Sequence, residues 1–218
     1  GTDRLGRDLL VRTLHGLRVS LAIAVAATLV ALVIGVAWGA FAGYRRGRTD
    51  ALMMRFVDVL YSLPQVFFVI ILTVAFGRGP LTILLAIGAF GWLTMARIVR
   101  GQAMALRERE FIDAAIVGGA TTRRIVLRHV IPNLIGPVIV YATLTLPQVI
   151  LVESFLSFLG IGIQEPLASL GNLVADGAAE METAPWMLAV PAACLMLLVF
   201  CFNFLGDSLR DALDPRDR

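Results

Sequence analysis

The side chains that carry out catalysis in enzymes are few in this sequence, and their spacing does not suit it. Cys194 and Cys201 stand seven residues apart in an apolar run. Along a helix that spacing is roughly 10 Å, which is too long for a disulfide, so both are expected to be small buried hydrophobic residues. His15 and His129 have no neighbours at metal-ligand spacing. The sequence therefore predicts no catalytic residue and no metal site.

Carboxylates and basic residues form no catalytic pattern either. Asp58 and Glu153 stand at the ends of different apolar runs and are expected to face opposite sides, so they are not predicted to act as an acid–base pair. All 19 residues in the lysine-plus-arginine total are arginine, whereas the phosphate-binding loop G-x-x-x-x-G-K-[ST] needs a lysine. If ATP drives this protein, another chain must hydrolyse the nucleotide.

A few polar side chains interrupt the apolar runs and are candidates for contact with a solute. Polar groups at membrane depth usually face a cavity, and this reasoning selects Tyr61, Ser62, Gln65, Gln148 and Asn203. Hydrogen bonds between helices are the alternative role for each of them. The sequence leaves both roles open.

One polar stretch, EFIDAAIVGGATTRRIVLRHVIPN, separates two long apolar runs. It predicts a short helix over Phe111–Val117 with acidic residues near its start, where they suit the helix dipole. Gly118–Gly119 predicts the end of that helix, and Thr121 or Thr122 is a ready N-cap for a second one. Such a corner can dock another protein or can hold the loop at the lipid head groups, and the residues alone favour neither.

The composition indicates that membrane-spanning helices hold these residues. The 218-residue chain is 58% hydrophobic and 16% charged, with a mean hydropathy of +0.83, whereas soluble domains are nearer a quarter charged. A bilayer core of ~30 Å needs about 20 apolar residues in a helix, and lipid excludes open strands. We therefore predict an all-α polytopic bundle with five spans, over Val19–Tyr44, Val59–Gly77, Gly79–Ala96, Val130–Val152 and Thr183–Gly206.

Prolines and glycines inside these windows predict departures from straight helices. Pro64, Pro137 and Pro147 are expected to kink their spans. Gly88 and Gly91 interrupt the third window, which is also the shortest.

The arginines predict the orientation, because cytoplasmic loops carry an excess of basic residues. Five spans leave Arg4, Arg7, Arg12, Arg18 and Arg78 on one side and the other 14 of the 19 on the opposite side. The side with 14 should be cytoplasmic, together with the C-terminus. The N-terminal segment is then external, so we expect one further span upstream in the full-length subunit.

The chain is expected to divide into an external segment, a membrane domain and a tail. Leucines at helical spacing make the external segment an amphipathic interfacial helix, which either anchors at the surface or gates the outer mouth. The outer loop is acidic and rich in glycine, which predicts a folded cap. The boundaries are 1–18 for the external segment, 19–206 for the membrane domain with a cytoplasmic loop at about 97–130 and an external loop at about 154–184, and 207–218 for the tail.

The polar stretch resembles the E-A-A-x-x-x-G…L-P loop of bacterial ABC importer permeases. In that family the loop forms the coupling helix, which seats in a cleft of the ATP-binding subunit. Asp113 takes the place of the usual glutamate and Ile131 that of leucine. The ATPase-coupling residues that the resemblance implies are Asp113, Ala114, Ala115, Gly119, Ile131 and Pro132.

Three more blocks extend the resemblance over nearly the whole chain. They are GTDRLGRDLL, ESFLSFLGIGIQEP…SLGNL and NFLGDSLRDALDPR. Together they resemble the second permease subunit of the dipeptide, oligopeptide and nickel importers. This family has six spans per subunit in the type I importer permease fold.

The resemblance also implies partners and a location. We expect a homologous second permease, two ATP-binding cassette subunits that bind ATP and magnesium, an external solute-binding protein and a bacterial inner membrane, with no cofactor on this chain and no nucleic acid. Peptide is the expected solute, and nickel or a glutathione-like solute is the alternative. An ATP-independent channel or carrier is the competing class of function, because it would need no coupling loop.

Overall fold

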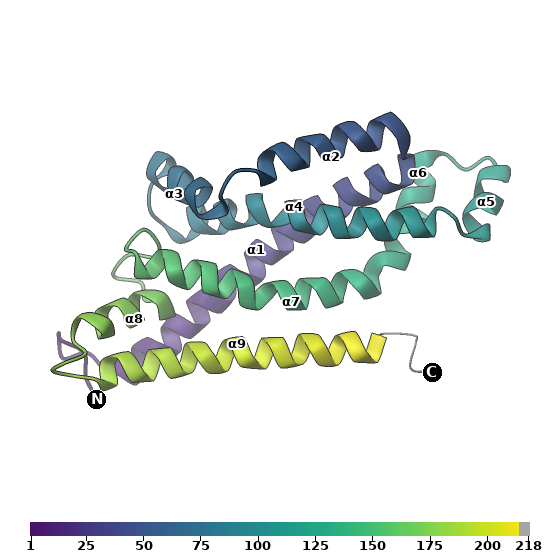
Figure 1. The fold of residues 1–218 in the computed structure, drawn as a ribbon. Helices are drawn as coiled ribbons and strands as arrows, with labels where there is room; N and C mark the ends of the chain where they lie inside the picture. The colour runs from purple at the N-terminus through teal and green to yellow at the C-terminus, as the bar shows by residue number, and fades with distance from the viewer. Residues whose placement is uncertain (214–218) are drawn as a thin grey trace.

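The protein is an elongated bundle of helices (Figure 1). The computed structural model describes residues 1–213, and within them the only bridge pairing is an isolated one between Thr2 and Asp8. The elements are α1 (Leu9–Arg45), α2 (Gly47–Tyr61), α3 (Gln65–Phe76), α4 (Pro80–Leu106), α5 (Glu110–Val117), α6 (Thr122–Ile125), the π-helical turn η1 (Val126–Val130), α7 (Ile131–Phe158), α8 (Leu170–Ala179) and α9 (Trp186–Leu213).

The helices account for the predicted number of spans. Four are long and apolar enough to cross a membrane: α1, α4, α9 and the run of α6, η1 and α7. The bent pair α2 and α3 makes a fifth if it is counted as one span. The all-α membrane bundle predicted from composition is therefore confirmed for the residues that the structure describes.

The most extensive helix contact lies between α1 and α4, and three glycines let the two backbones approach closely. Gly35, Gly39 and Gly43 recur at four-residue spacing on one face of α1. A Cβ atom at Gly39 would lie 2.4 Å from the carbonyl oxygen of Ala96, and one at Gly43 would lie 2.5 Å from that of Arg100. Small residues at this spacing let two helices approach closely, as in other membrane proteins.

The second predicted span differs from the structure. The window Val59–Gly77 was expected to be one helix kinked at Pro64, but the chain breaks there into α2 and α3, which are bent by 77°. Ion pairs to α4 hold α2 along the bundle: Arg100 donates to both carboxylate oxygens of Asp50 at 2.6 Å, and Arg97 donates to Asp58 at 2.7 Å. These ion pairs stabilise the broken arrangement relative to a straight helix. Breaking the helix at Pro64 costs little, because proline has no backbone N–H to donate.

Glycines do not interrupt the third span, contrary to expectation. Gly88 and Gly91 lie inside the continuous helix α4, which reaches Leu106. A Cβ atom at Gly88 would approach Val30 to 3.0 Å, and one at Gly91 would approach Ala31 to 3.3 Å. Both glycines therefore serve the packing of α4 on α1 rather than ending a helix.

The N-terminal segment is not a separate helix. Residues 9–18 form the first turns of α1, and residues 1–8 form a compact loop whose Asp8 side chain caps α1 by accepting from the amide of Val11. Whether this region lies at the membrane interface stays a prediction. The outer loop folds around α8, whose N-terminus carries a reciprocal capping box of Ser169 and Asn172.

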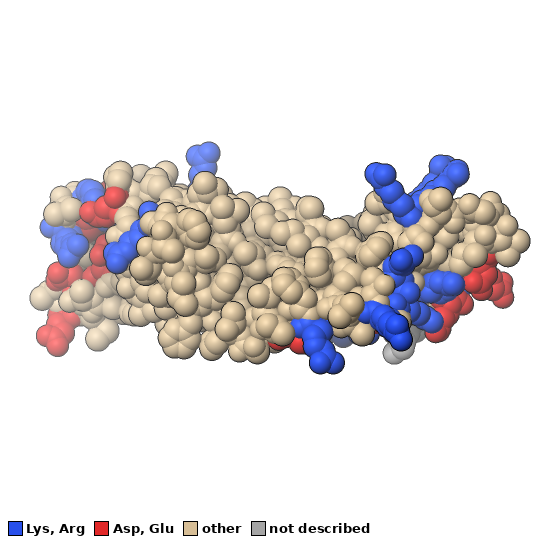
Figure 2. Space-filling view, turned by 90° about the horizontal axis from the view of Figure 1, so that it is seen from above, with Lys and Arg blue, Asp and Glu red and all other residues tan. Residues whose placement is uncertain are grey.

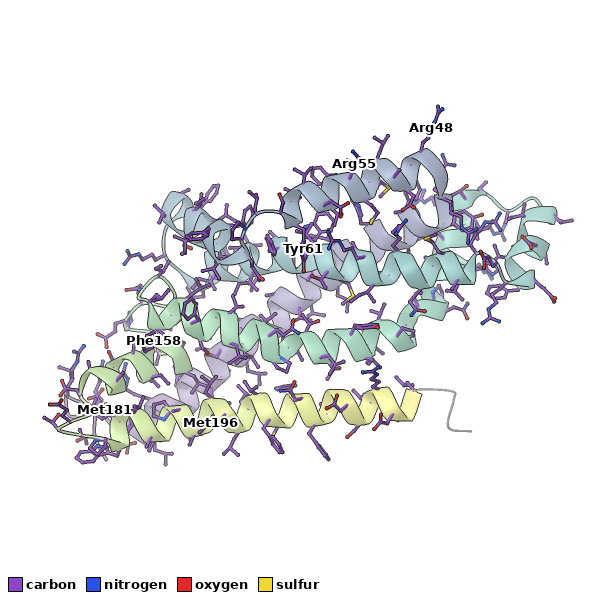
Figure 3. All side chains as sticks on the ribbon, in the orientation of Figure 1. Arg48, Arg55, Tyr61, Phe158, Met181 and Met196 are labelled. Atoms are coloured by element: carbon purple, nitrogen blue, oxygen red, sulfur yellow. The ribbon has the colours of Figure 1, made fainter. Side chains whose placement is uncertain are left out.

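The two ends of the bundle carry most of the charge (Figure 2). Helices α5 and α6 lie at one end, and the N-terminal loop and α8 lie at the other (Figure 1). Arg48 points away from the bundle near the α5 end (Figure 3). The last described turn of α9 also lies toward that end, beyond the predicted tail boundary at 206, while residues 214–218 of the predicted tail lie outside the described residues.

The α1–α4 contact predicts a sharp difference between two glycine-to-alanine changes. Gly39→Ala should destabilise the protein by about 1–3 kcal/mol, because the new methyl group must push two backbones apart. Gly101→Ala is the matched control on α4: no atom lies within 4 Å of its Cβ position, so it should be neutral or slightly stabilising. Thermal unfolding in detergent measures both, and equal melting temperatures would contradict the proposed role of Gly39.

Candidate coupling site and translocation pathway

Helix α5 ends in a glycine turn, as its sequence predicts. Gly119 has a φ of +75°, the left-handed conformation that glycine adopts without strain. The amide of Ala120 donates to the carbonyl of Ala115 at 3.0 Å, and the amide of Gly119 donates to that of Ile116 at 2.9 Å. This pair of bonds is a Schellman motif, which satisfies the last carbonyls of the helix.

After the glycine turn, the chain returns to the bundle through three consecutive helical segments, α6, η1 and α7. Thr121 is the N-cap of α6 and accepts from the amide of Arg124 at 3.4 Å. The π-helical turn η1 connects α6 to α7, whose first two residues are Ile131 and Pro132. The six residues of the predicted coupling motif therefore run from α5 through the glycine turn to the start of α7.

Helix α5 has one face in the core and one face exposed. Ile112 is 0% exposed and packs in a cluster with residues of α1, α4 and α7, such as Tyr44, Val99 and Leu134. On the outer side, the side chain of Val117 is 89% exposed. Ile112 thus connects α5 to three of the long helices. The other large apolar residues exposed on α5 are Phe111 and Ile116.

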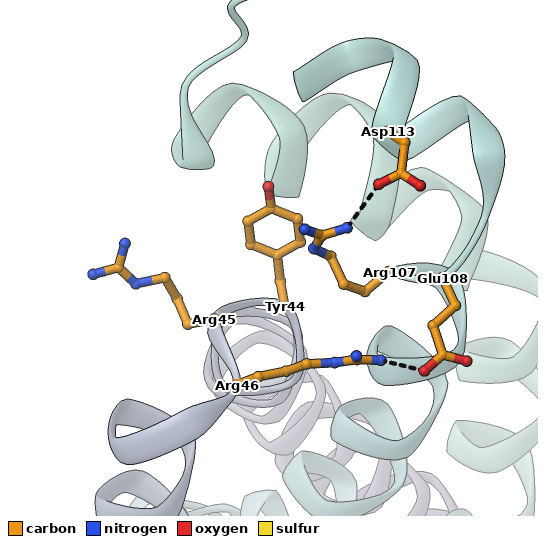
Figure 4. Close-up of a pocket in the computed structure, with 6 residues that line it drawn as sticks. All are labelled: Tyr44, Arg45, Arg46, Arg107, Glu108 and Asp113. Carbon is orange, nitrogen blue, oxygen red and sulfur yellow. Dashed lines mark hydrogen bonds and ion pairs between the residues drawn. The ribbon is translucent and has the colours of Figure 1, made fainter. Parts of the chain in front are cut away.

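A polar pocket of about 540 Å³ lies between α5 and the ends of α1 and α4 (Figure 4). Asp113 accepts from Arg107 at 3.1 Å, and the guanidinium of Arg107 lies 5.5 Å from the ring centroid of Tyr44. Arg46 donates to Glu108 at 2.9 Å (Figure 4). The acidic residue of the coupling motif is therefore tied to the end of α4.

A second pocket, of about 100 Å³, gathers three of the five candidate pathway residues. Tyr61, Gln65 and Gln148 line it, whereas Ser62 and Asn203 do not. The Ser62 hydroxyl donates to the carbonyl of Val59 at 2.7 Å, and Asn203 is exposed on α9. We call the space between α1, α3, α4 and α7 the pathway pocket.

Three threonines complete the polar lining of the pathway pocket, and sequence reasoning missed them. Thr28, Thr94 and Thr145 lie near the middle of α1, α4 and α7. Threonine gives a weak signal, because its hydroxyl can bond its own helix, as Thr145 does to the carbonyl of Tyr141. Thr28 differs, since its buried hydroxyl has no hydrogen-bond partner among the described residues.

Tyr61 is the last residue of α2, before the break to α3, and lines the pathway pocket. Its side chain is labelled in Figure 3. Its ring stacks on Phe90 with centroids 6.1 Å apart. The guanidinium of Arg97 lies 4.1 Å from the centroid of the Tyr61 ring, and Arg97 also pairs with Asp58. Cation–π and ion-pair contacts thus hold this aromatic side chain in place.

At the opposite end, an ion-pair cluster joins the N-terminal loop to the outer loop. Asp3 is buried and accepts from Arg7 at 2.7 Å and from Arg12 at 2.6 Å, and both arginines also reach Glu165. Burial alone would raise the pKa of Asp3, but hydrogen bonds from the two arginines and from backbone amides outweigh it and hold that pKa well below its usual range. The hydrogen bond from Arg7 likewise lowers the pKa of Glu165.

The lowered pKa values predict how stability depends on pH at this end. A carboxyl whose pKa is lower in the folded state stabilises the fold above its unfolded value and loses that effect as the pH falls through the folded value. The ordinary values are 3.8 for Asp3 and 4.5 for Glu165. Asp3→Asn should therefore cost about 1–2 kcal/mol at neutral pH, after discounting for partly exposed partners, and progressively less below about pH 4.

Thermal unfolding of the wild type and of Asp3→Asn across this pH range measures the effect. Asp8→Asn is the matched control, because asparagine also caps a helix and should change stability little at any pH. A cost of Asp3→Asn that does not vary with pH would contradict the ion-pair account.

Comparison with known proteins agrees with this architecture. The chain is 56% identical to the oligopeptide transport system permease protein OppC of Haemophilus influenzae, over 100% of this chain and 70% of the relative. It is 56% identical to OppC of Escherichia coli K12, over 100% of this chain and 72% of the relative. The dipeptide transport system permease protein DppC of Bacillus subtilis is 48% identical, over 100% of this chain and 68% of the relative.

Solved structures share the fold. A chain of the MetNI methionine ABC transporter in an inward-facing conformation superposes with a TM-score of 0.74 at 19% identity, covering 94% of this chain and 97% of that chain. A chain of an amino acid ABC transporter superposes with a TM-score of 0.61 at 16% identity, covering 92% of this chain and 93% of that chain. At these identities the likeness concerns the fold alone. Residues 31–218 match the family described as binding-protein-dependent transport system inner membrane component, and the chain belongs to that family.

Proposed function

We propose that this chain is a permease subunit of an ATP-driven importer that takes up peptides. The observation that carries the proposal is helix α5, which is anchored in the core by Ile112 and exposes an apolar face at the arginine-rich end. Membership of a binding-protein-dependent transport family supports it and disfavours an ATP-independent channel or carrier. The oligopeptide and dipeptide permease names of its relatives favour peptide over nickel as the solute.

The sequence and the size of the pathway pocket indicate which partners the chain would need. Without any lysine it has no ordinary phosphate-binding loop, so ATP and magnesium are assigned to two partner ATPase subunits. A homologous second permease would complete the pore, because a pocket of about 100 Å³ lined by one chain is small for a peptide. An external binding protein would deliver the solute. The α5 end is assigned to the cytoplasm of a bacterial inner membrane, and the last described turn of α9, which lies toward that end, would be cytoplasmic as well.

In the proposed cycle, the movement of the ATPase subunits acts first on α5. ATP binding would close the two ATPase subunits and draw the coupling helices together. Since Ile112 packs against α1, α4 and α7, movement of α5 would move the walls of the pathway pocket as rigid bodies. The pocket would then open outward and receive solute, as alternating access requires. Asp113 and its bond to Arg107 would keep α5 in register with α4 during this movement.

The pathway pocket suits a solute that forms neutral hydrogen bonds. Its lining is largely apolar, but six of the lining residues carry a hydroxyl or amide group and none carries an ionised side chain. Such groups can exchange hydrogen bonds with successive peptide units of any sequence. Selection among peptides is then assigned mainly to the external binding protein.

The exposed tip of α5 predicts a variant that disrupts docking and leaves the fold intact. Val117→Asp should leave membrane insertion unchanged, because Val117 is 89% exposed. It should weaken association with the ATPase subunit at least about tenfold, since a charge would replace an apolar side chain on the proposed interface. Gly119→Arg should act in the same direction by straining the glycine turn. Copurification from detergent with the ATPase subunits of the same transporter measures the association.

Leu5→Asp is the matched control for Val117→Asp. Leu5 is also an exposed apolar residue, with 63% of its surface accessible, but it lies at the opposite end of the bundle. The control should retain the ATPase. If Val117→Asp and Gly119→Arg both copurify with the ATPase and transport peptide at the wild-type rate, the assignment of α5 as the coupling helix is wrong.

The pathway pocket predicts a difference between two amide side chains. Gln148→Leu should reduce uptake of a radiolabelled tripeptide into proteoliposomes about three- to tenfold, through the loss of one hydrogen bond at the pocket. Asn203→Leu should have a smaller effect, because Asn203 does not line the pocket. Equal losses in the two variants would contradict the assignment of this pocket to the pathway.

A further inference from the structure

A buried carboxyl group near the outer end of α7 has no part in the coupling or in the pathway described above. Glu153 is 0% exposed. Its two carboxyl oxygens accept hydrogen bonds from the hydroxyls of Ser20 and Ser157, each at 2.8 Å. No ion pair to Glu153 is present within residues 1–213. A carboxyl group buried in this way is costly unless hydrogen bonds satisfy it, so these two serines matter for the fold.

The same two serines also bind the outer loop. The amide of Leu170 donates to the Ser20 hydroxyl at 3.2 Å, and the amide of Ile163 donates to the Ser157 hydroxyl at 3.2 Å. Each hydroxyl therefore accepts from the outer loop and donates its own hydrogen to Glu153. We call each chain of amide, serine hydroxyl and carboxyl group a relay. One relay runs through Ser20 of α1 and the other through Ser157 of α7, and both end on the carboxyl group of Glu153.

Glycines make room for these relays. A Cβ atom at Gly162 would lie 2.1 Å from the Ser157 hydroxyl oxygen, and one at Gly171 would lie 2.2 Å from the carbonyl oxygen of Ser154. The outer loop thus lies against the end of α7 at a distance that only glycine permits. The block ESFLSFLGIGIQEP…SLGNL, which the family resemblance picked out, contains this whole arrangement except Ser20.

The relays also involve two helices, α1 and α7, that line the pathway pocket. Val152, the residue before Glu153, lines that pocket together with Val149 one turn earlier. On α1, Ser20 precedes the pocket residue Thr28 by about two helical turns. The outer loop is consequently fixed to two of the helices that form the pocket walls.

We propose that Glu153 is a positioning residue that locks the outer loop onto α1 and α7, so that a binding protein docking on the outer loop moves the walls of the pathway pocket. The assignment of a docking partner rests on the function proposed above. The lock itself does not, because it is formed within this chain.

Amide hydrogen exchange in lipid nanodiscs, followed by mass spectrometry, tests the lock. Glu153→Gln replaces one acceptor oxygen by a donor, so it removes the acceptor of one of the two serines and should raise exchange at Ile163 or at Leu170 at least about tenfold. Ser20→Ala should raise exchange at Leu170 alone, and Ser157→Ala at Ile163 alone. General destabilisation would not separate the two sites in this reciprocal way, so these milder variants decide the matter even if Glu153→Gln folds poorly.

Glu182→Gln is the matched control, because Glu182 is an exposed residue of the same outer loop. It should leave exchange at both amides unchanged. Unchanged exchange in all three test variants, or equal increases at both amides in every one, would overturn the lock.

A second measurement tests whether the lock carries the docking signal. In the purified transporter, Glu153→Gln should lower the ratio of binding-protein-stimulated to basal ATPase activity at least about fivefold, while basal activity stays within about twofold of the wild type. If a variant with raised exchange keeps the wild-type ratio of stimulated to basal ATPase activity, the proposal that the lock carries the docking signal to the pathway pocket is wrong. The wild type separates the two proposals: a wild-type chain that associates with no ATPase contradicts the proposed function, whereas failure of the variants in an active complex contradicts only the inference about Glu153.

Discussion

The close contact of α1 and α4 is the interaction on which the rest of the structure depends. In a membrane the hydrophobic effect does not hold helices together, so van der Waals packing must do so. Gly35, Gly39 and Gly43 let α1 approach the backbone of α4, and Gly88 and Gly91 do the same from α4. This pair forms one wall of the pathway pocket, and α4 leads directly into the coupling loop.

The two segments that we propose as partner contacts, one at each end of the bundle, are attached to these helices by different kinds of interaction. At the α5 end the attachment is apolar, through Ile112 in a core cluster, and polar groups such as Asp113 lie at its edge. At the outer end the attachment is polar, through the two serines around Glu153. The pathway pocket lies between the two attachments. Under the proposed function, movement at either end would reach the same walls, which is what an importer needs to couple nucleotide and solute.

Features that depend on neighbouring residues could be predicted from the sequence. The length of α5, the glycine turn after it and the cap at Thr121 all follow from local backbone preferences, and the structure contains each of them. The apolar windows likewise predicted the number and type of the spans, because lipid demands a minimum length and a closed set of backbone hydrogen bonds. The resemblance to the coupling loop of the permeases was visible for the same reason: the residues that carry it lie close together in sequence.

The sequence by itself thus determined that the apolar windows are helical and where the glycine turn after α5 lies. Tertiary structure decided what the polar residues inside the membrane do. It broke one predicted span at Pro64, gathered Tyr61, Gln65 and Gln148 around a pocket and left Ser62 and Asn203 outside it. It also placed Ser20 against Glu153, 133 residues away. Helical periodicity says which residues share a face, but only the packing of one helix on another says what that face meets.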